Sequence, residues 1–259
     1  MARKQQSPRV GGKRTPLINQ AAWWLADYLY AGWRQLAAIC SRADPRACNT
    51  GSGTPVLVIP GVYESWRFML PLIRDLHLRG HPVHVVTPLR GNRVPVTEGA
   101  RLVDEYLAER DLRGVVIVAH SKGGLIGKHL MSFGASAPRV NALVAIATPF
   151  GGSRYARFLL GSTLRAFSPR DATLSQLAST LGVNSRIVSV FPGFDPHIPE
   201  GSELSGARNV RVETGGHFRI LAHPRTITEV RRVAARSPFA ADPVREPGHN
   251  CGPDLQPGP

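Results

Sequence analysis

One segment of the chain must turn sharply from a buried strand into a helix, and a serine stands at the turn. Residues 114–118 form an apolar block rich in β-branched residues, which favours a strand, and residues 125–131 are predicted to be helical. Between them, Ala119-His120-Ser121-Lys122-Gly123 places small residues two positions before and after Ser121, which lets the strand and helix pass closely. Such a turn lifts the serine hydroxyl clear of the sheet, which is the arrangement that a nucleophilic serine needs.

Apolar strands and helices alternate along residues 55–236. We expect strands at residues 56–59, 83–87, 115–118, 142–147, 186–191 and 209–213. We expect helices at residues 65–78, 97–110 (capped by Thr97 and Glu98), 122–133 and 226–235, with helical structure broken by Pro169 between 152 and 183. Strands that are apolar throughout are typical of a parallel sheet with both faces covered. The pattern therefore predicts a doubly wound α/β fold with a mostly parallel sheet.

Three further segments flank this α/β domain. Residues 1–16 are basic and polar and are expected to be disordered, residues 17–54 hold an aromatic-rich helix and a linker, and the proline-rich residues 237–259 are expected to form a flexible tail. No apolar run is long enough to cross a bilayer, and we expect no removable secretory signal, because polar residues interrupt the segment that follows the basic N-terminus. The cysteines Cys40, Cys48 and Cys251 lack metal-ligand spacing and indicate a reducing compartment, so we expect a cytoplasmic protein.

The predicted helix at 17–40 is unusual in its aromatic content. It carries Trp23, Trp24, Tyr28, Tyr30 and Trp33 within about three turns. One interpretation is a helix packed across the edge of the domain. The other is an amphipathic element that touches a membrane or an acyl substrate, because Trp and Tyr favour interfaces.

The positive charge of the chain does not by itself indicate nucleic-acid binding. The formal net charge is +14, but arginine is scattered along the whole chain, and no predicted helix presents a basic stripe with interleaved aromatic residues. General solubility, or weak attraction to an anionic membrane surface, explains the charge better. A hydrophobic content of 42% and a charged content of 19% describe an ordinary globular protein.

A nucleophilic serine needs a base, and the base needs an acid that orients it. Asp195 follows the predicted strand at 186–191, and His217 follows the predicted strand at 209–213. The carboxyl ends of parallel strands meet at one edge of a sheet, so both residues can reach Ser121. Alternatives stay open for both partners. The acid could be Glu200 or Glu203, and the base could be His223. His120 is expected to be a packing or polar neighbour of the serine.

Three motifs together resemble the α/β-hydrolase superfamily, specifically its bacterial esterase and lipase branch, which is similar to triacylglycerol lipases. They are Ala119-His120-Ser121-Lys122-Gly123-Gly124, Ala147-Thr148-Pro149-Phe150-Gly151-Gly152-Ser153 and Gly216-His217-Phe218, and the resemblance spans about residues 55–235. It implies Ser121 as nucleophile, Asp195 as orienting acid and His217 as general base, in the chain order of that fold.

The same resemblance implies an oxyanion hole of two backbone N–H groups. One belongs to Lys122, after the nucleophile, and the other to the loop Gly61-Val62-Tyr63, with Val62 as the best candidate. The side chain of Lys122 is expected to be solvated or near the entrance. Two departures from the family pattern are Ala119, which replaces the usual first glycine, and Pro60-Gly61, which replaces the common His-Gly pair.

For the substrate, the resemblance implies a carboxylic ester with an apolar acyl group, and no metal or organic cofactor. Expected substrate contacts are Tyr63, His120, Phe150, Phe158 and Phe218. Residues 153–183 occupy the position of a helical lid, whose apolar side chains would be Phe158, Leu159, Leu160, Leu164, Phe167, Leu174 and Leu177, unless these are ordinary core residues. Thioesterase or acyltransferase chemistry through the same serine remains open, as does a non-catalytic lipid-binding or scaffold protein on this fold. The sequence leaves the oligomeric state open.

Overall fold

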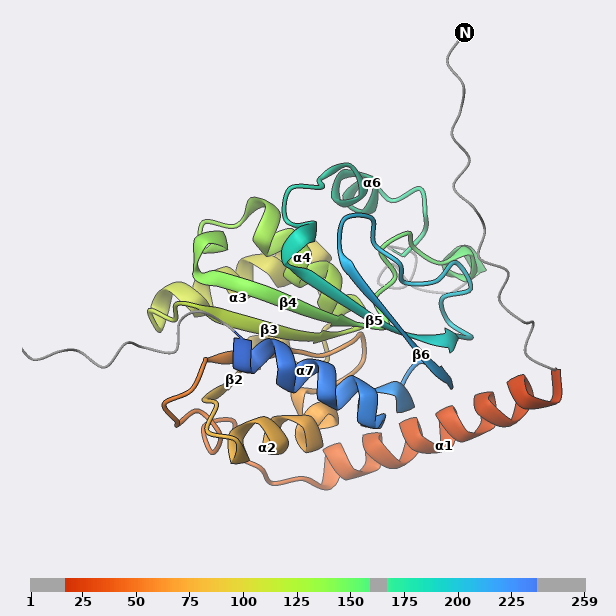
Figure 1. Ribbon diagram of the computed structural model, residues 1–259, viewed down its shortest axis with the longest axis horizontal. Coiled ribbons are helices and arrows are strands. Elements are labelled where there is room, and N and C mark those ends of the chain that lie inside the picture. The colour runs from red at the N-terminus through yellow and green to blue at the C-terminus, as the bar shows by residue number, and fades with distance from the viewer. Residues whose placement is uncertain (1–16, 159–166, 237–259) are drawn as a thin grey trace, which may run out of the picture.

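The computed structural model describes residues 17–158 and 167–236, and in that part six strands form one sheet (Figure 1). The strand order is β2-β1-β3-β4-β5-β6, and every neighbouring pair is parallel. The strands are β1 (Val56–Ile59), β2 (Val83–Val85), β3 (Val115–His120), β4 (Val140–Ile146), β5 (Ile187–Phe194) and β6 (Arg208–Gly215). The predicted α/β fold with a parallel sheet is confirmed.

Side chains alternate across the sheet and fill one core on each face. Leu57 and Ile59 of β1 point into one core, and Val56 and Val58 point into the other. The first core is covered by α3 (Val96–Glu109), α4 (Lys122–Phe133) and α6 (Ala172–Ser179), and the second by α2 (Leu70–Leu78) and α7 (Pro224–Arg236) (Figure 1). Burial on both faces explains why β1 and most of β3 are apolar throughout, whereas the edge strand β6 exposes Arg208, Asn209, Arg211 and Glu213.

The longest described helix, α1 (Leu17–Cys40), lies along the outside of the domain and extends past α7 (Figure 1). It packs against the 3-10 turn at Trp66–Met69, against β6 and against the 3-10 turn at Arg219–Ala222. Its predicted boundaries agree with the structure, and it does pack across an edge of the domain, as the first interpretation holds.

The chain switches direction between β1 and β3, and this brings two loops together. From β1 the chain passes to β2 on one side and returns to β3 on the other. Ile59 at the end of β1 pairs with Ala119 near the end of β3. The loop after β1 and the turn at Ser121 therefore lie side by side at the carboxyl edge of the sheet, where ligands bind in open α/β folds.

Several predicted boundaries differ from the structure for local reasons. Residues 66–69 form a 3-10 turn before α2, whose first turn holds Pro71. Residues 87–89 form another, where Pro88 has no N–H to donate to a neighbouring strand. The predicted cap by Thr97 and Glu98 is wrong. Pro95 precedes α3 and no side chain caps it, while Glu98 pairs with Arg101 at 2.7 Å.

Residues 152–183 do not form one broken helix in the described part. A 3-10 turn spans Arg154–Phe158, and α6 covers Ala172–Ser179. Phe167, Leu174 and Leu177 are buried in the core beside α4, so these three candidate lid residues are core residues. Leu159, Leu160, Leu164 and the side chain of Phe158 lie outside the described part.

The turn from β3 into α4 leaves no room for a side chain at Gly123. A Cβ there would lie 2.4 Å from the carbonyl oxygen of Ile59, which β1 holds in place. We predict that Gly123→Ala lowers the free energy of unfolding by about 1–3 kcal/mol, measured by urea denaturation. The control is Gly32→Ala, because a Cβ at Gly32 would have no atom within 4 Å. This variant should raise the free energy of unfolding by up to about 1 kcal/mol. Equal stability of Gly123→Ala and the wild type would contradict the close approach.

Candidate active site

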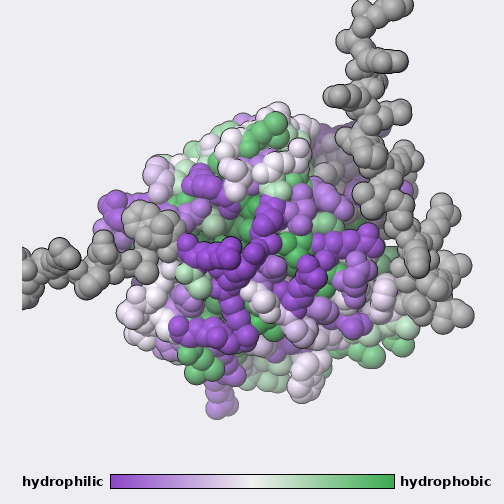
Figure 2. Space-filling model, viewed as in Figure 1, coloured by the Kyte–Doolittle hydropathy of each residue, from purple (hydrophilic) through white to green (hydrophobic). Residues whose placement is uncertain are grey.

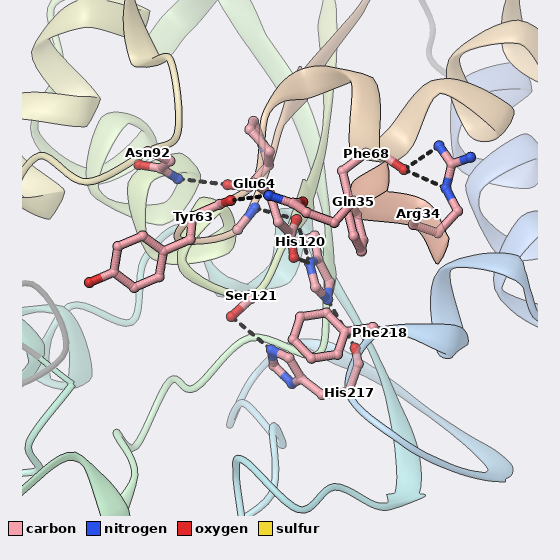
Figure 3. A network of polar contacts seen from close by, with 12 residues as sticks. Arg34, Gln35, Tyr63, Glu64, Phe68, Asn92, His120, Ser121, His217 and Phe218 are labelled. Carbon is pink, nitrogen blue, oxygen red and sulfur yellow. Dashed lines mark hydrogen bonds and ion pairs between the residues drawn. The ribbon is translucent and has the colours of Figure 1, made fainter. Parts of the chain in front are cut away.

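Ser121, Asp195 and His217 come together at the carboxyl edge of the sheet (Ser121 and His217 in Figure 3). His217 Nε2 lies 3.0 Å from Ser121 Oγ, and His217 Nδ1 lies 2.8 Å from Asp195 Oδ2. All three residues are buried. Because a carboxylate only accepts, Nδ1–H of His217 donates to Asp195, which leaves Nε2 free to accept the serine proton.

The alternative partners lie elsewhere. Glu200 forms an ion pair with Arg154 at 2.7 Å, and Glu203 is exposed. His223 accepts the backbone N–H of Arg225. None of these side chains contacts Ser121, so the geometry favours Asp195 and His217.

Ser121 has a strained backbone, with φ 50° and ψ −119°. A non-glycine residue in this region costs about 1–3 kcal/mol and persists only when its surroundings fix it. Its N–H donates to Ile146 O of β4 at 2.8 Å, and its carbonyl accepts the N–H of Gly124 at 3.0 Å. These bonds hold the turn in the conformation that points Oγ at His217.

Asp195 is held as a carboxylate. Its burial alone would raise its pKa, but His217 and the N–H of His197 outweigh burial and hold the pKa of Asp195 below its usual range. Oδ1 accepts the backbone N–H groups of His197 and Ile198 at 2.8 and 3.1 Å. Oδ2 is thereby aimed at His217, and a negative charge is ready to stabilise an imidazolium there.

Two backbone N–H groups beside Ser121 are available to a ligand. Val62 lies in the loop after β1 and lines the same cavity as Ser121. Lys122 is the first residue of α4, so its N–H precedes the hydrogen bonds of the helix. Over residues 17–158 and 167–236, neither N–H has a backbone or side-chain acceptor.

The side chain of Lys122 is buried, so the expectation that it is solvated or near the entrance is wrong. It is 1% exposed, and Nζ donates to the carbonyl oxygens of Asn92, at 3.0 Å, and of Val94. Its burial lowers its pKa to about 8. Asn92 in turn donates to Pro60 O at 2.6 Å (Figure 3). Lys122 therefore ties the start of α4 to the loop after β2, and Asn92 ties that loop to the loop after β1.

His120 lies beneath the site instead of in it, so the expected contact with a substrate is wrong. It is fully buried and does not line the cavity. Nδ1 lies 2.9 Å from Glu64 Oε2, and Nε2 lies 3.0 Å from His217 O (Figure 3). The carbonyl of His217 only accepts, so Nε2–H donates to it, and the carboxyl group of Glu64 beside Nδ1 favours the imidazolium form. Burial opposes that charge, but Glu64 outweighs burial and raises the pKa of His120.

Glu64 was not identified from the sequence. Its carboxylate is buried and also accepts the N–H of Gly61 at 2.8 Å. Glu64 and His120 thus connect the loop after β1 to the backbone of His217. Sequence reasoning could not pair two residues that are 56 positions apart and share no motif.

Asp27 of α1 was also missed, and it holds the loop that carries His217. Its fully buried carboxylate accepts three consecutive backbone N–H groups, those of His217 at 2.7 Å and of Phe218 and Arg219 at 2.8 Å each. Gly216, with φ 112°, lets the carboxylate approach, since a Cβ there would lie 2.5 Å from Asp27 Oδ1. The sequence does hold one indication of a special role for Asp27, which is the single acidic residue of the 24-residue helix α1.

A cavity of about 630 Å³ adjoins Ser121 and His217, and its lining is mostly apolar. Tyr63 and Phe218 line it, as expected of substrate contacts. Phe150 does not, because it is buried in the core beside Lys128. The α1 helix forms one wall through Tyr28, Ala31, Gly32 and Gln35. Cavities of this size and character bind small apolar ligands with a few polar groups.

His197 also lines the cavity and packs on the catalytic candidate. Its ring centroid lies 4.8 Å from that of His217, and its Nε2 is 3.0 Å from Tyr28 Oη. Burial, together with the neighbouring His217, lowers the pKa of His197 to about 4. It is therefore neutral near pH 7 and adds no charge that would oppose an imidazolium at His217.

No metal site accompanies these residues in the part of the chain that the structure covers. There, no group of three or more His, Cys, Asp or Glu side chains is arranged to hold an ion.

Similarity to known proteins is found in the structure of the chain and not in its sequence. No family model and no curated protein matches the chain. Its structure is similar to the mature lipase BlEst2 of Bacillus licheniformis, with a TM-score of 0.59 and 14% identity over 74% of this chain and 96% of that one. It is also similar to lipase B of Aspergillus fumigatus, with a TM-score of 0.58 and 15% identity over 71% of this chain and 53% of that one.

A third similar structure is an extracellular α/β-hydrolase from a Paenibacillus species, with a TM-score of 0.51 and 16% identity over 71% of this chain and 99% of that one. Together these structures show that the chain has the α/β-hydrolase fold. The expected resemblance is confirmed at that level.

We predict that Asp27→Ala destabilises the protein through the loop at 217–219. Three buried N–H groups would lose their acceptor, at about 1–3 kcal/mol for each group left unpaired. Urea denaturation should show the lower free energy of unfolding. Amide hydrogen exchange should become faster at residues 217–219 than in the wild type, by a larger factor than in β3. Gln35→Ala is the control on the same helix, because Gln35 makes one exposed bond to Tyr63 O and should cost little. Unchanged exchange at 217–219 in Asp27→Ala would contradict the role of Asp27.

The Glu64–His120 pair predicts a pH-dependent stability. His120 has a folded-state pKa above its usual value of about 6.5, so the pair stabilises the fold below that pH and loses this contribution as pH rises through the folded-state pKa. Glu64→Gln should therefore lower the free energy of unfolding more at about pH 6 than at about pH 9. The control Glu105→Gln removes an exposed partner of Arg101 and should change little at either pH. A loss that grows with pH would show that His120 is not charged.

Proposed function

We propose that this chain is a serine hydrolase that cleaves carboxylic esters with an apolar acyl group through an acyl-serine intermediate. The observation that carries the proposal is the continuous line of hydrogen bonds from Ser121 through His217 to Asp195, at the wall of an apolar cavity. Two of the structural neighbours are named lipases, which agrees with it.

In the acylation step, Ser121 Oγ attacks the ester carbonyl while His217 Nε2 accepts the serine proton. The 3.0 Å separation of these atoms is within the reach that proton transfer needs. Asp195, held as a carboxylate, stabilises the imidazolium that forms and keeps the ring oriented. His217 then gives the proton to the departing alcohol oxygen.

The tetrahedral intermediate carries a negative oxygen, which the Val62 and Lys122 N–H groups bind in this proposal. Both flank Ser121 and have no acceptor of their own in the described part of the chain. Removal of one such donor costs about 2.7–4 kcal/mol of transition-state stabilisation in related sites. Water then attacks the acyl-serine, with His217 as base, and releases the acid. These steps need no metal or organic cofactor.

The acyl group occupies the cavity in this proposal. Tyr28 and Gly32 of α1, Phe218 beside the candidate base and Phe167 supply apolar wall, which suits an alkyl chain better than a charged group. Ser153, Tyr155 and Ala156 also contribute to the wall, so in this proposal the segment after β4 serves as a lid over part of the acyl site.

The proposal predicts that a fluorophosphonate probe labels Ser121 and no other serine of the folded protein. Ser121→Ala should abolish the label and lower p-nitrophenyl ester hydrolysis by at least about 10³-fold, because the nucleophile is gone. Peptide mass spectrometry locates the adduct. The control Ser179→Ala, at an exposed position on α6, should keep both label and activity.

The same assay, run over esters from acetate to palmitate, determines the acyl preference. An adduct-free folded protein would leave a non-catalytic binding protein as the better description. Hydrolysis that survives in Ser121→Ala would overturn the site assignment.

A further inference from the structure

The outward face of α1 is apolar, which reverses the usual orientation of a surface helix. Its exposed side chains, here called the outer face of α1, are Trp24, Leu25, Leu29, Trp33, Leu36 and Ile39, and they are 49–72% exposed. Figure 2 shows hydrophobic residues at the lower right edge, where Figure 1 places α1. A helix at a protein–water boundary normally turns its polar side outward.

The charged residues of α1 all point into the domain. Asp27 is fully buried against the loop of His217. Arg34 donates to the carbonyl oxygens of Arg67 at 2.9 Å and of Phe68 at 2.8 Å (Figure 3 shows the bonds to Phe68). These contacts fix the helix in rotation, so the outer face cannot turn inward without breaking them.

We infer that the outer face of α1 docks on an anionic phospholipid surface, with the helix lying in the plane of that surface. Contiguous apolar patches of this kind mark interaction sites, and Trp side chains favour the boundary between headgroups and acyl chains. No helix in the described part of the chain is long and apolar enough to cross a membrane. A helix tied down along one side by Asp27 and Arg34 instead presents its other side to the lipid.

The positive charge of the chain favours an anionic membrane as the surface that binds the outer face of α1. Residues 1–16, which lead directly into α1, contain Arg3, Lys4, Arg9, Lys13 and Arg14 and no acidic residue, and the whole chain carries +14. Basic residues near an anionic membrane contribute about 1 kcal/mol each. A second copy of the chain would instead bring two strongly positive molecules together, which like-charge repulsion disfavours.

The docking face is continuous with the wall of the cavity. Tyr28, Gly32 and Gln35 line the cavity, and Leu25, Leu29 and Leu36 stand next to them around the helix. A surface-bound α1 therefore brings the cavity close to the lipid. The docking itself does not depend on the proposed chemistry of Ser121.

The test uses the full chain and vesicle flotation. Wild-type protein should bind vesicles of 70% phosphatidylcholine and 30% phosphatidylglycerol at least ten times more strongly than vesicles of phosphatidylcholine alone. The triple variant Leu29→Gln, Trp33→Gln, Leu36→Gln should lose at least ten-fold in partitioning, while glutamine keeps the helix intact. The matched control Leu78→Gln, Phe133→Gln, Leu181→Gln changes three exposed apolar residues elsewhere and should bind as the wild type does.

Three outcomes would overturn the docking proposal. The first is a triple variant that binds vesicles as strongly as the wild type does. The second is equal binding of the wild type to neutral and anionic vesicles. The third is a wild-type dimer in sedimentation equilibrium that is absent in the triple variant. Circular dichroism and urea denaturation should show that both triple variants fold. Ser121→Ala protein should float like the wild type, so that a failure of the catalytic proposal is distinguishable from a failure of the docking proposal.

Discussion

The candidate active site depends on a buried carboxylate that binds three consecutive backbone N–H groups. Asp27 takes the N–H groups of residues 217–219, and a second carboxylate, Glu64, reaches the same loop from the other side through His120. A loop that follows a strand would otherwise expose its N–H groups to water and move freely. With both contacts in place the backbone of the His217 loop is held, and Asp195 orients the imidazole, which a proton relay requires.

Burial explains why so many charges surround one serine. Each ionic group beneath the site has its partners: Asp195 has two backbone N–H groups, His120 has a carboxylate and a carbonyl, and the ammonium of Lys122 has two carbonyls. An unpaired charge in such a place would cost several kcal/mol or lose its ionisation. The cavity beside Ser121 is mostly apolar, and Glu64 also reaches its lining.

The fold and the three central residues could be predicted because their signals are local. Continuous apolar strands indicate a parallel sheet, and Ser121, Asp195 and His217 each follow a strand end. Asp27 and Glu64, which hold the His217 loop, could not be predicted, because their partners are 190 and 56 positions away in the sequence. Lys122 was misjudged for the same reason, since its carbonyl partners belong to the loop after β2. The cap at Thr97 failed because Pro95 already starts that helix.

The position of α1 has a consequence for how this protein can be divided. By sequence, an α/β domain starts near residue 55, and everything before it looks like an addition. In space, residues 20–40 close one wall of the cavity and provide the acceptor for the His217 loop. A fragment that starts at residue 55 would keep all six strands and all three central residues, yet its cavity would open to solvent along one side and its His217 loop would lose its anchor. The smallest unit that retains the site is therefore longer than the sheet and its covering helices.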